Sequence, residues 1–152
     1  EMCIRDRNLT ARSPRELPTP RHLGRQLPHK ARTRMKNLNK KAREVSLATP
    51  QGTDFTVKLA GTALRRLRGL FFSDAPALMI VPCSSVHSIG FNRPLEVAYI
   101  DKDGQVLTVK DLKPWNMHMP VRNAYAVLEA NPGLLGQWGI REGVRIILSG
   151  DT

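Results

Sequence analysis

The chain contains few of the residues from which standard sites are built. It has two cysteines, Cys3 and Cys83, and aromatic residues make up 5% of its 152 residues. No CxxC–CxxC spacing, pair of carboxylates or Ser-His-Asp order occurs, which argues against a common zinc site and a standard catalytic set. The glycines between 133 and 143 match neither a dinucleotide-binding nor a P-loop motif. We therefore predict no cofactor and no metal, and leave open whether the protein is an enzyme.

Long apolar segments are also missing. No stretch reaches the ~18 consecutive apolar residues of a membrane span. The charged residues that follow Met35 have no apolar segment behind them, unlike a signal peptide. These absences predict a soluble, cytoplasmic protein.

Acidic residues are scarce, and the resulting charge of +11 is unevenly distributed. Residues 1–34 carry nine Lys or Arg and three acids, while the rest of the chain carries fifteen and ten. Most of the charge therefore belongs to the tail, and aromatic base-stacking platforms are few. We do not expect the folded domain to bind nucleic acid, and predict a small ligand or a protein as its partner.

The tail at 1–34 has no period of 2 or 3.6, and its Arg- and Pro-rich composition predicts disorder. Residues 1–7 resemble the translated end of a sequencing-library transposon adapter. We interpret 8–34 as upstream DNA read in frame and Met35 as the start; the alternative is a genuine basic arm. Starting at Met35 would leave Cys83 as the only cysteine and exclude an intrachain disulfide.

Short apolar segments separated by Gly, Pro and Asp follow a charged lead-in at 35–44. They predict one antiparallel β-sandwich or barrel domain over 45–149. Residues 62–72 change to a helical period and predict one short amphipathic helix, while 132–140 allow at most a helical turn. The predicted strands are 45–48, 55–59, 77–82, 95–101, 105–110, 124–130 and 144–148, with 85–89 as an open extension of the third.

Four short motifs occur in an order that resembles the DUF192 family. They are Arg68-Gly-Leu, the segment Pro94–Asp101 with Gly104-Gln-Val, Ala126-Val-Leu-Glu, and Gly139–Val144. Many members carry Met-Lys-Asn-Thr before the Pro-Leu-Asp strand. This chain has Ser88-Ile-Gly-Phe there, preceded by Cys83 and His87, and is similar to a branch with Cys and His at this place. The resemblance implies a small, mainly β domain and no particular reaction.

Cys83 and His87 are the residues from which a reactive site could be built. If residues 82–92 are extended, as we expect, their Cα atoms lie ~13 Å apart, too far for a thiol and its base. A bend at residues 82–85 would bring them together. Cys83, His87 and His118 with Met117 or Met119 also form a soft ligand set that suits copper, although the spacing fits no ligand rule.

The sequence favours a non-enzymatic binding or accessory module. Polar residues predicted in loops suggest a ligand pocket, and the arginines of the predicted helix are candidates for anion binding. The competing hypothesis is a thiol- or metal-dependent enzyme that uses Cys83, His87 and His118. The pocket candidates are Cys83, His87, Arg93, Trp115 and His118, and the anion-binding candidates are Arg65, Arg66 and Arg68.

Overall fold

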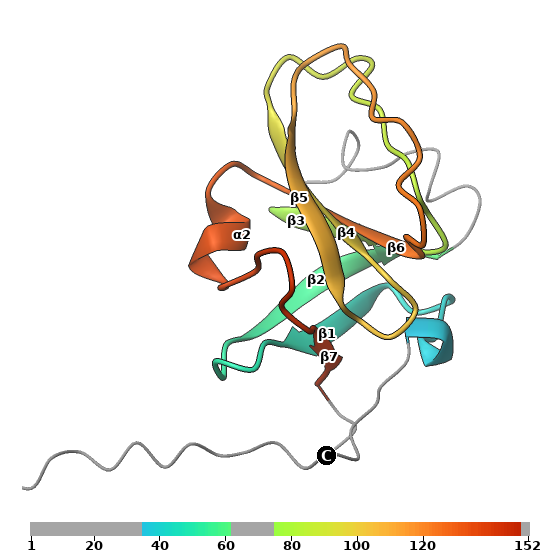
Figure 1. Ribbon diagram of the computed structural model, residues 1–152, viewed down its shortest axis with the longest axis vertical. Coiled ribbons are helices and arrows are strands. Elements are labelled where there is room, and N and C mark those ends of the chain that lie inside the picture. Colours follow the sequence, from blue (N-terminus) through green and yellow to red (C-terminus); the bar gives the residue numbers. More distant parts are fainter. Residues whose placement is uncertain (1–34, 62–74, 150–152) are drawn as a thin grey trace, which may run out of the picture.

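The computed structural model describes residues 35–61 and 75–149, which form a mainly β structure (Figure 1). Within these described residues, seven strands and one short α-helix follow a single 3₁₀ turn. In chain order they are η1 (Met35–Asn37), β1 (Glu44–Ala48), β2 (Asp54–Ala60), β3 (Ala77–Ile80), β4 (Leu95–Ile100), β5 (Val106–Leu112), β6 (Ala126–Ala130), α2 (Leu134–Gln137) and β7 (Ile147–Leu148).

All seven strands belong to one sheet with the order β5-β4-β6-β3-β2-β1-β7. The β4–β5 hairpin turns at Asp101–Gly104, where the Asp101 carboxylate accepts hydrogen bonds from the backbone of Asp103 and Gln105. Every pair is antiparallel except β2–β3, which is parallel. A parallel pair needs a crossover connection from the end of one strand to the start of the next, rather than a tight hairpin.

The sheet curls so far that edge strand β5 is hydrogen-bonded to the segment just before the other edge strand, β7. Val106 at the start of β5 donates its backbone N–H to Val144 and accepts from Gly143, both shortly before β7. The backbone N–H of Ile146 similarly donates to Gly104. One curled sheet, rather than two stacked sheets, makes the fold barrel-like rather than a sandwich.

The inner face of the curled sheet encloses the larger of two apolar cores. Alternate residues of β2, β3, β4 and β6 point into it. Trp138, directly after α2, packs against this core and stacks on Phe55 with ring centroids 4.4 Å apart. The predicted lead-in also contributes, because Met35 and Leu38 are buried there.

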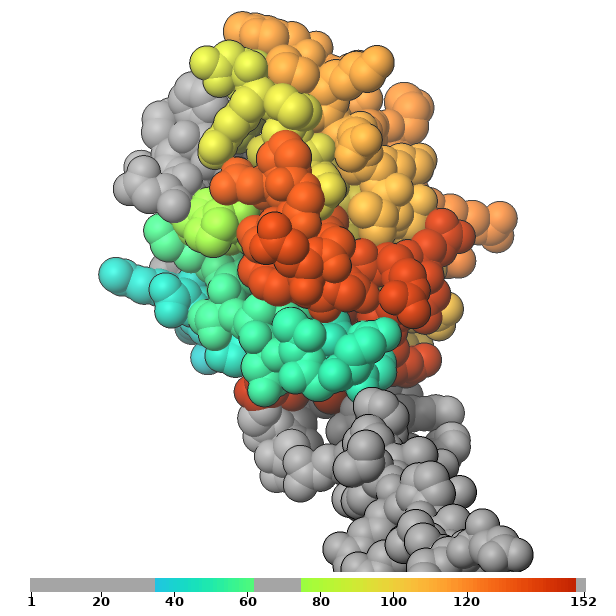
Figure 2. Space-filling view, turned by 90° about the vertical axis from the view of Figure 1, so that its left-hand side faces the viewer, coloured from blue at the N-terminus to red at the C-terminus, as the bar shows by residue number. Residues whose placement is uncertain are grey.

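The outer face carries a second core, which long loops cover. Residues 81–94 connect β3 to β4, and residues 113–125 connect β5 to β6; we call these two segments the paired loops. Val86, Phe91, Val121 and Ala124 of the paired loops pack against outward-facing strand residues. Figure 1 shows them side by side at the upper end of the molecule, and Figure 2 shows that end lying opposite β1 and β2.

The mainly β class and the 95–101/105–110 hairpin are confirmed, as is the single helical turn within 132–140. The straight segment expected at 82–92 is wrong. No strand forms there, because Phe91 N–H bonds to Ser88 in a turn at Gly90, whose φ is 92°. The helix predicted at 62–72 lies outside the described residues.

Candidate functional site

The paired loops are joined by backbone hydrogen bonds, although they form no regular strand. The backbone N–H of Val121 donates to the Ser84 carbonyl, and the backbone N–H of His118 donates to the Val86 carbonyl. The backbone N–H of Asn116 donates to the side chain of Ser88. Residues 87 and 117 form an isolated antiparallel bridge. The loops therefore form an irregular two-stranded ribbon with a backbone arrangement fixed before any partner binds.

Ser88 fastens the centre of this ribbon and is fully buried. Its hydroxyl donates towards the carbonyls of Lys113 and Asn116 and accepts the Asn116 N–H at 2.9 Å. The backbone N–H of Ser88 donates to the Asn116 carbonyl, and the Ser88 carbonyl accepts from the backbone N–H of Trp115. Because these hydrogen bonds satisfy partly buried backbone groups of residues 113–116, this serine orders the segment that carries Trp115.

Alternation along the ribbon separates its side chains into two sets. Val86 and Ser88 are buried against the sheet, whereas His87 between them is exposed. On the facing segment His118 is half-buried, whereas Met117 and Met119 are exposed. His87 and His118 thus point to opposite sides of the ribbon.

The inward set includes a polar group around Tyr99 of β4. The Tyr99 hydroxyl lies 2.9 Å from Nδ1 of His118, and Nε2 of His118 lies 3.2 Å from the Asp111 carbonyl. A carbonyl only accepts, so Nε2 carries the proton and Nδ1 of a neutral His118 accepts from Tyr99. Burial, followed by the nearby Cys83 and Glu129, raises the pKa of Tyr99 well above its usual value.

The thiol and the imidazole that a thiol enzyme would need are already held in hydrogen bonds within the protein. Both ring nitrogens of His118 are hydrogen-bonded, and the Cys83 thiol donates to the Ser85 carbonyl at 2.9 Å. Within 35–61 and 75–149, no three His, Cys, Asp or Glu side chains gather as metal ligands would. The inward set is therefore suited to anchoring the ribbon on the sheet.

The outward set is apolar. In the described part of the chain, the exposed large apolar side chains all lie on the paired loops. They are Ile89, Trp115, Met117 and Met119, with exposed fractions of 58, 69, 62 and 77%. We call these four the outward apolar row, and a concentration of this kind marks an interaction surface.

Charge on the paired loops has one sign. They carry Arg93, Lys113 and Arg122, all exposed, and no Asp or Glu. The remaining described residues hold nine Lys or Arg against eight acids, so most of the net charge of the described domain lies beside the outward apolar row. The chain positions of the cations place them towards the two ends of the ribbon.

The predicted pocket residues divide between the two sides of the ribbon. Cys83 packs against the outer core and His118 anchors to Tyr99. His87, Arg93 and Trp115 are exposed. Sequence reasoning assigned no role to Ile89, Ser88 or Tyr99, and considered Met117 and Met119 only as metal ligands; the every-second-residue spacing of 115, 117 and 119 was the available signal. Arg65, Arg66 and Arg68 lie outside the described residues.

Comparison with protein families places this site in a known domain. Residues 46–148 match the DUF192 model, whose description is "Uncharacterized ACR". The chain belongs to the DUF192 family. The predicted resemblance is thereby confirmed.

Relatives of this DUF192 domain include UPF0127 proteins of archaea. One from Thermococcus kodakarensis is 27% identical over 95 residues, covering 57% of this chain and 60% of the relative. One from Pyrococcus furiosus is 25% identical over 97 residues, covering 59% of this chain and 84% of the relative. The match thus spans less than two thirds of the first relative.

Two solved structures share the fold. A protein from Sinorhizobium meliloti 1021, named as a candidate transcription regulator, is 25% identical with a TM-score of 0.57, covering 69% of this chain and 92% of that protein. A protein of unknown function from Novosphingobium aromaticivorans is 22% identical with a TM-score of 0.55, and the match covers 68% of this chain and 82% of that protein. Neither name assigns the DUF192 fold a reaction.

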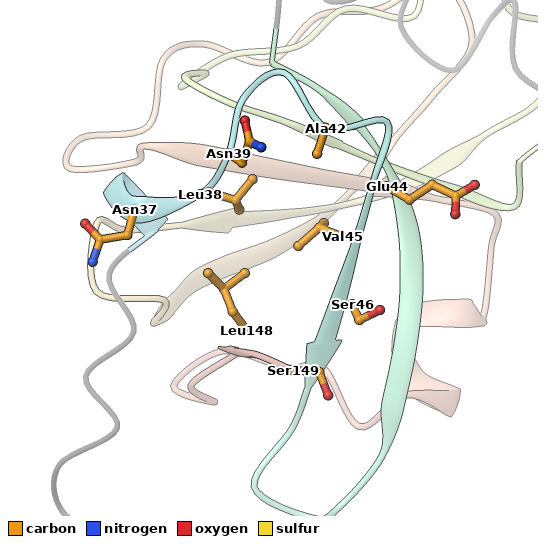
Figure 3. Close-up of a pocket in the computed structure, with 9 residues that line it drawn as sticks. All are labelled: Asn37, Leu38, Asn39, Ala42, Glu44, Val45, Ser46, Leu148 and Ser149. Atoms are coloured by element: carbon orange, nitrogen blue, oxygen red, sulfur yellow. The ribbon is translucent and has the colours of Figure 1, made fainter. Parts of the chain in front are cut away.

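A separate depression of about 270 Å³ lies between η1, β1 and β7 of the DUF192 domain (Figure 3). Leu38, Val45 and Leu148 supply its apolar lining, and Glu44 is its single ionisable residue. The predicted site residues do not line it, and its chemistry is that of an ordinary surface hollow. In the described segments, no helix is long and apolar enough to cross a membrane.

Proposed function

We propose that this DUF192 domain is a non-enzymatic binding module whose binding surface is the outward side of the paired loops. The outward apolar row supplies the contact area, and Arg93, Lys113 and Arg122 favour an anionic partner. The observation that carries the proposal concerns the residues that the structure describes. Their four exposed large apolar side chains all lie on one ribbon, and that ribbon has no acidic residue.

Trp115 gives separate support because its backbone is unfavourable for its side chain. Its φ is 56°, in the left-handed region that bulky residues rarely occupy. Its indole is also 69% exposed, so packing gains little in return. Hydrogen bonds at Ser88 nevertheless hold this conformation, as is common where local strain serves binding.

Nucleic acid is the partner suggested by the name of the Sinorhizobium relative. Phosphate contacts require cations, and the paired loops provide three. The outward apolar row between them would gain nothing from a phosphate backbone. We therefore propose a partner that offers both negative charge and apolar groups. The predicted cytoplasmic location remains a prediction.

The proposal can be tested with small amphiphiles that differ in charge. Decanoate below its micelle concentration should shift the amide NMR signals of residues 84–89 and 115–121 in the full chain. Decyltrimethylammonium, which has an apolar chain of similar length but is cationic, should shift them much less because the loops repel it.

Two variants check that the effect belongs to the loops. Met117→Gln with Met119→Gln should weaken decanoate binding, whereas Gln137→Ala on α2, an exposed control, should leave it unchanged. Equal shifts with both amphiphiles, or shifts elsewhere in the domain, would contradict the proposal.

A further inference from the structure

We infer that the partner of the paired loops is an anionic phospholipid surface, with the outward apolar row inserted between headgroups. This inference rests on the proposed function and specifies its partner. It requires three properties of the protein surface on the paired loops. Apolar side chains must protrude, cations must lie near them, and acidic side chains must point elsewhere.

The protrusion follows from exposure. Each member of the outward apolar row is more than half exposed, so these side chains stand clear of the ribbon and cannot be the walls of a closed groove. Insertion between lipid headgroups needs no matching shape, and Trp is enriched at that depth. A protein partner would instead have to supply a complementary pocket for each protruding side chain.

The sheet beneath the ribbon keeps negative charge away from this surface. Glu96 and Asp111 are opposite one another in the β4–β5 register. They alternate with Val97 and Leu112, which lie in the outer core, so both carboxylates point to the other face of the sheet. Glu129 shares the outer face but is buried.

Cations accompany the apolar row instead. Lys110 is exposed and pairs with Val97 of the outer core, so it points to the same side as the paired loops. It adds to Arg93, Lys113 and Arg122. A second copy of the chain would bring these like charges together, which disfavours self-association through this face.

Association of this kind combines two weak contributions. Peripheral binding grows with buried apolar area and with attraction to anionic lipids. Each Lys or Arg near an anionic surface strengthens binding by about fivefold. Three or four cations with four inserted side chains predict a reversible association rather than permanent anchoring.

The fluorescence of Trp115 measures insertion directly. The chain has two tryptophans, and Trp138→Phe leaves Trp115 as the single one while keeping an aromatic ring on Phe55. In this full-chain variant, vesicles of phosphatidylglycerol and phosphatidylcholine should shift Trp115 emission to shorter wavelengths. Brominated acyl chains in these vesicles should quench the Trp115 emission. Vesicles of phosphatidylcholine alone should cause a much smaller shift and, when brominated, much less quenching.

Quenching of Trp115 is the appropriate measurement because residues 1–34 carry nine Lys and Arg, which can themselves attract anionic vesicles. Co-sedimentation alone would not separate the tail from the loops. Quenching by bromine within the bilayer requires that position 115 enters it. Added Met117→Gln and Met119→Gln should reduce this quenching severalfold.

A matched pair of charge variants tests the cations. Arg93→Gln with Lys113→Gln should weaken vesicle binding, measured by Trp115 quenching, by roughly 30-fold. Lys102→Gln with Arg141→Gln removes two exposed charges elsewhere on the domain and should change it far less. Equal effects of the two pairs would overturn the inference.

The remaining outcomes are also decisive. Trp115 emission that stays unchanged on vesicles that sediment the protein overturns the lipid inference. If a soluble peptide of alternating Glu and Leu changes that emission while vesicles do not, the partner is a protein and the proposed function stands. If vesicles, the peptide and decanoate all fail, the proposed function fails as well.

Discussion

The two faces of the single sheet are built differently. The inner face is closed by strands and by the stacked Phe55–Trp138 pair, and its buried side chains are apolar. The outer face is covered by loops, and its buried groups include Tyr99, Glu129 and Ser88. We expect the inner face to supply most of the stability of the domain, whereas the buried polar groups of the outer face hold the ribbon in place.

This difference indicates where function can change without loss of the fold. Side chains that point outward from the ribbon contribute little to packing, because they are mostly solvated. The inward side chains fix the backbone that presents them. Four substitutions probe this division, from the deepest site to the most exposed.

Leu128→Ala should have the largest effect on stability. Leu128 is fully buried in the inner core, between Met79 and Ala98 in the sheet register. We expect a loss of about 2–5 kcal/mol in the free energy of unfolding, measured in urea. A loss below about 1 kcal/mol would mean that the inner face is not the main source of stability.

Ser88→Ala should destabilise less and locally. It removes the acceptor of the partly buried Asn116 N–H and the donor to two carbonyls, which costs about 1–3 kcal/mol. Hydrogen exchange should accelerate at 84–88 and 115–121 while β2 and β6 stay protected. Uniform acceleration across the sheet would show that the ribbon and the barrel unfold as one unit.

Tyr99→Phe should have a smaller effect, of about 0.5–1.5 kcal/mol at neutral pH, through the lost bond to His118. It should also alter the pH dependence. Burial raises the pKa of Tyr99 above that of the unfolded chain. Its contribution is therefore complete below pH ~10 and declines as pH rises further, because the unfolded chain releases that proton first.

The difference in unfolding free energy between wild type and Tyr99→Phe, followed in urea from neutral pH upward, measures this contribution. The advantage of the wild type should narrow above pH ~10. An advantage that grew with pH would show that the folded domain favours the Tyr99 phenolate.

Trp115→Asn should have the smallest effect on stability. The indole is largely exposed, and Asn tolerates the positive φ at this position. We expect a change of less than about 0.5 kcal/mol in urea unfolding, together with weaker decanoate binding. A large loss of stability would place Trp115 in the outer core and remove the distinction between the two sides of the ribbon.

The strands and the hairpin could be predicted because their signals are local. Alternation in 95–101, followed by Asp and Gly in a tight turn, is sufficient to form β4 and β5. The parallel β2–β3 pair could not be read locally, since it joins residues such as Lys58 and Leu78 that are not linked by a tight turn. The burial of Met35 depends likewise on long-range packing against the inner core.

The candidate site was predicted only in its components. Cys83, His87, Arg93, Trp115 and His118 all lie on the paired loops, although residues 82–92 were expected to be extended. Their division into inward and outward sets was not foreseen, because it depends on hydrogen bonds between segments about thirty residues apart.

By itself, the sequence determined a mainly β domain and its family and predicted candidate site residues, because alternation, turn chemistry and short motifs act between near neighbours. Tertiary structure alone decided which of those residues share a surface. Pairing of the two loops turned His118 towards Tyr99 and His87 towards solvent. Side-chain direction in an irregular loop is set by its partner segment, which local sequence does not encode.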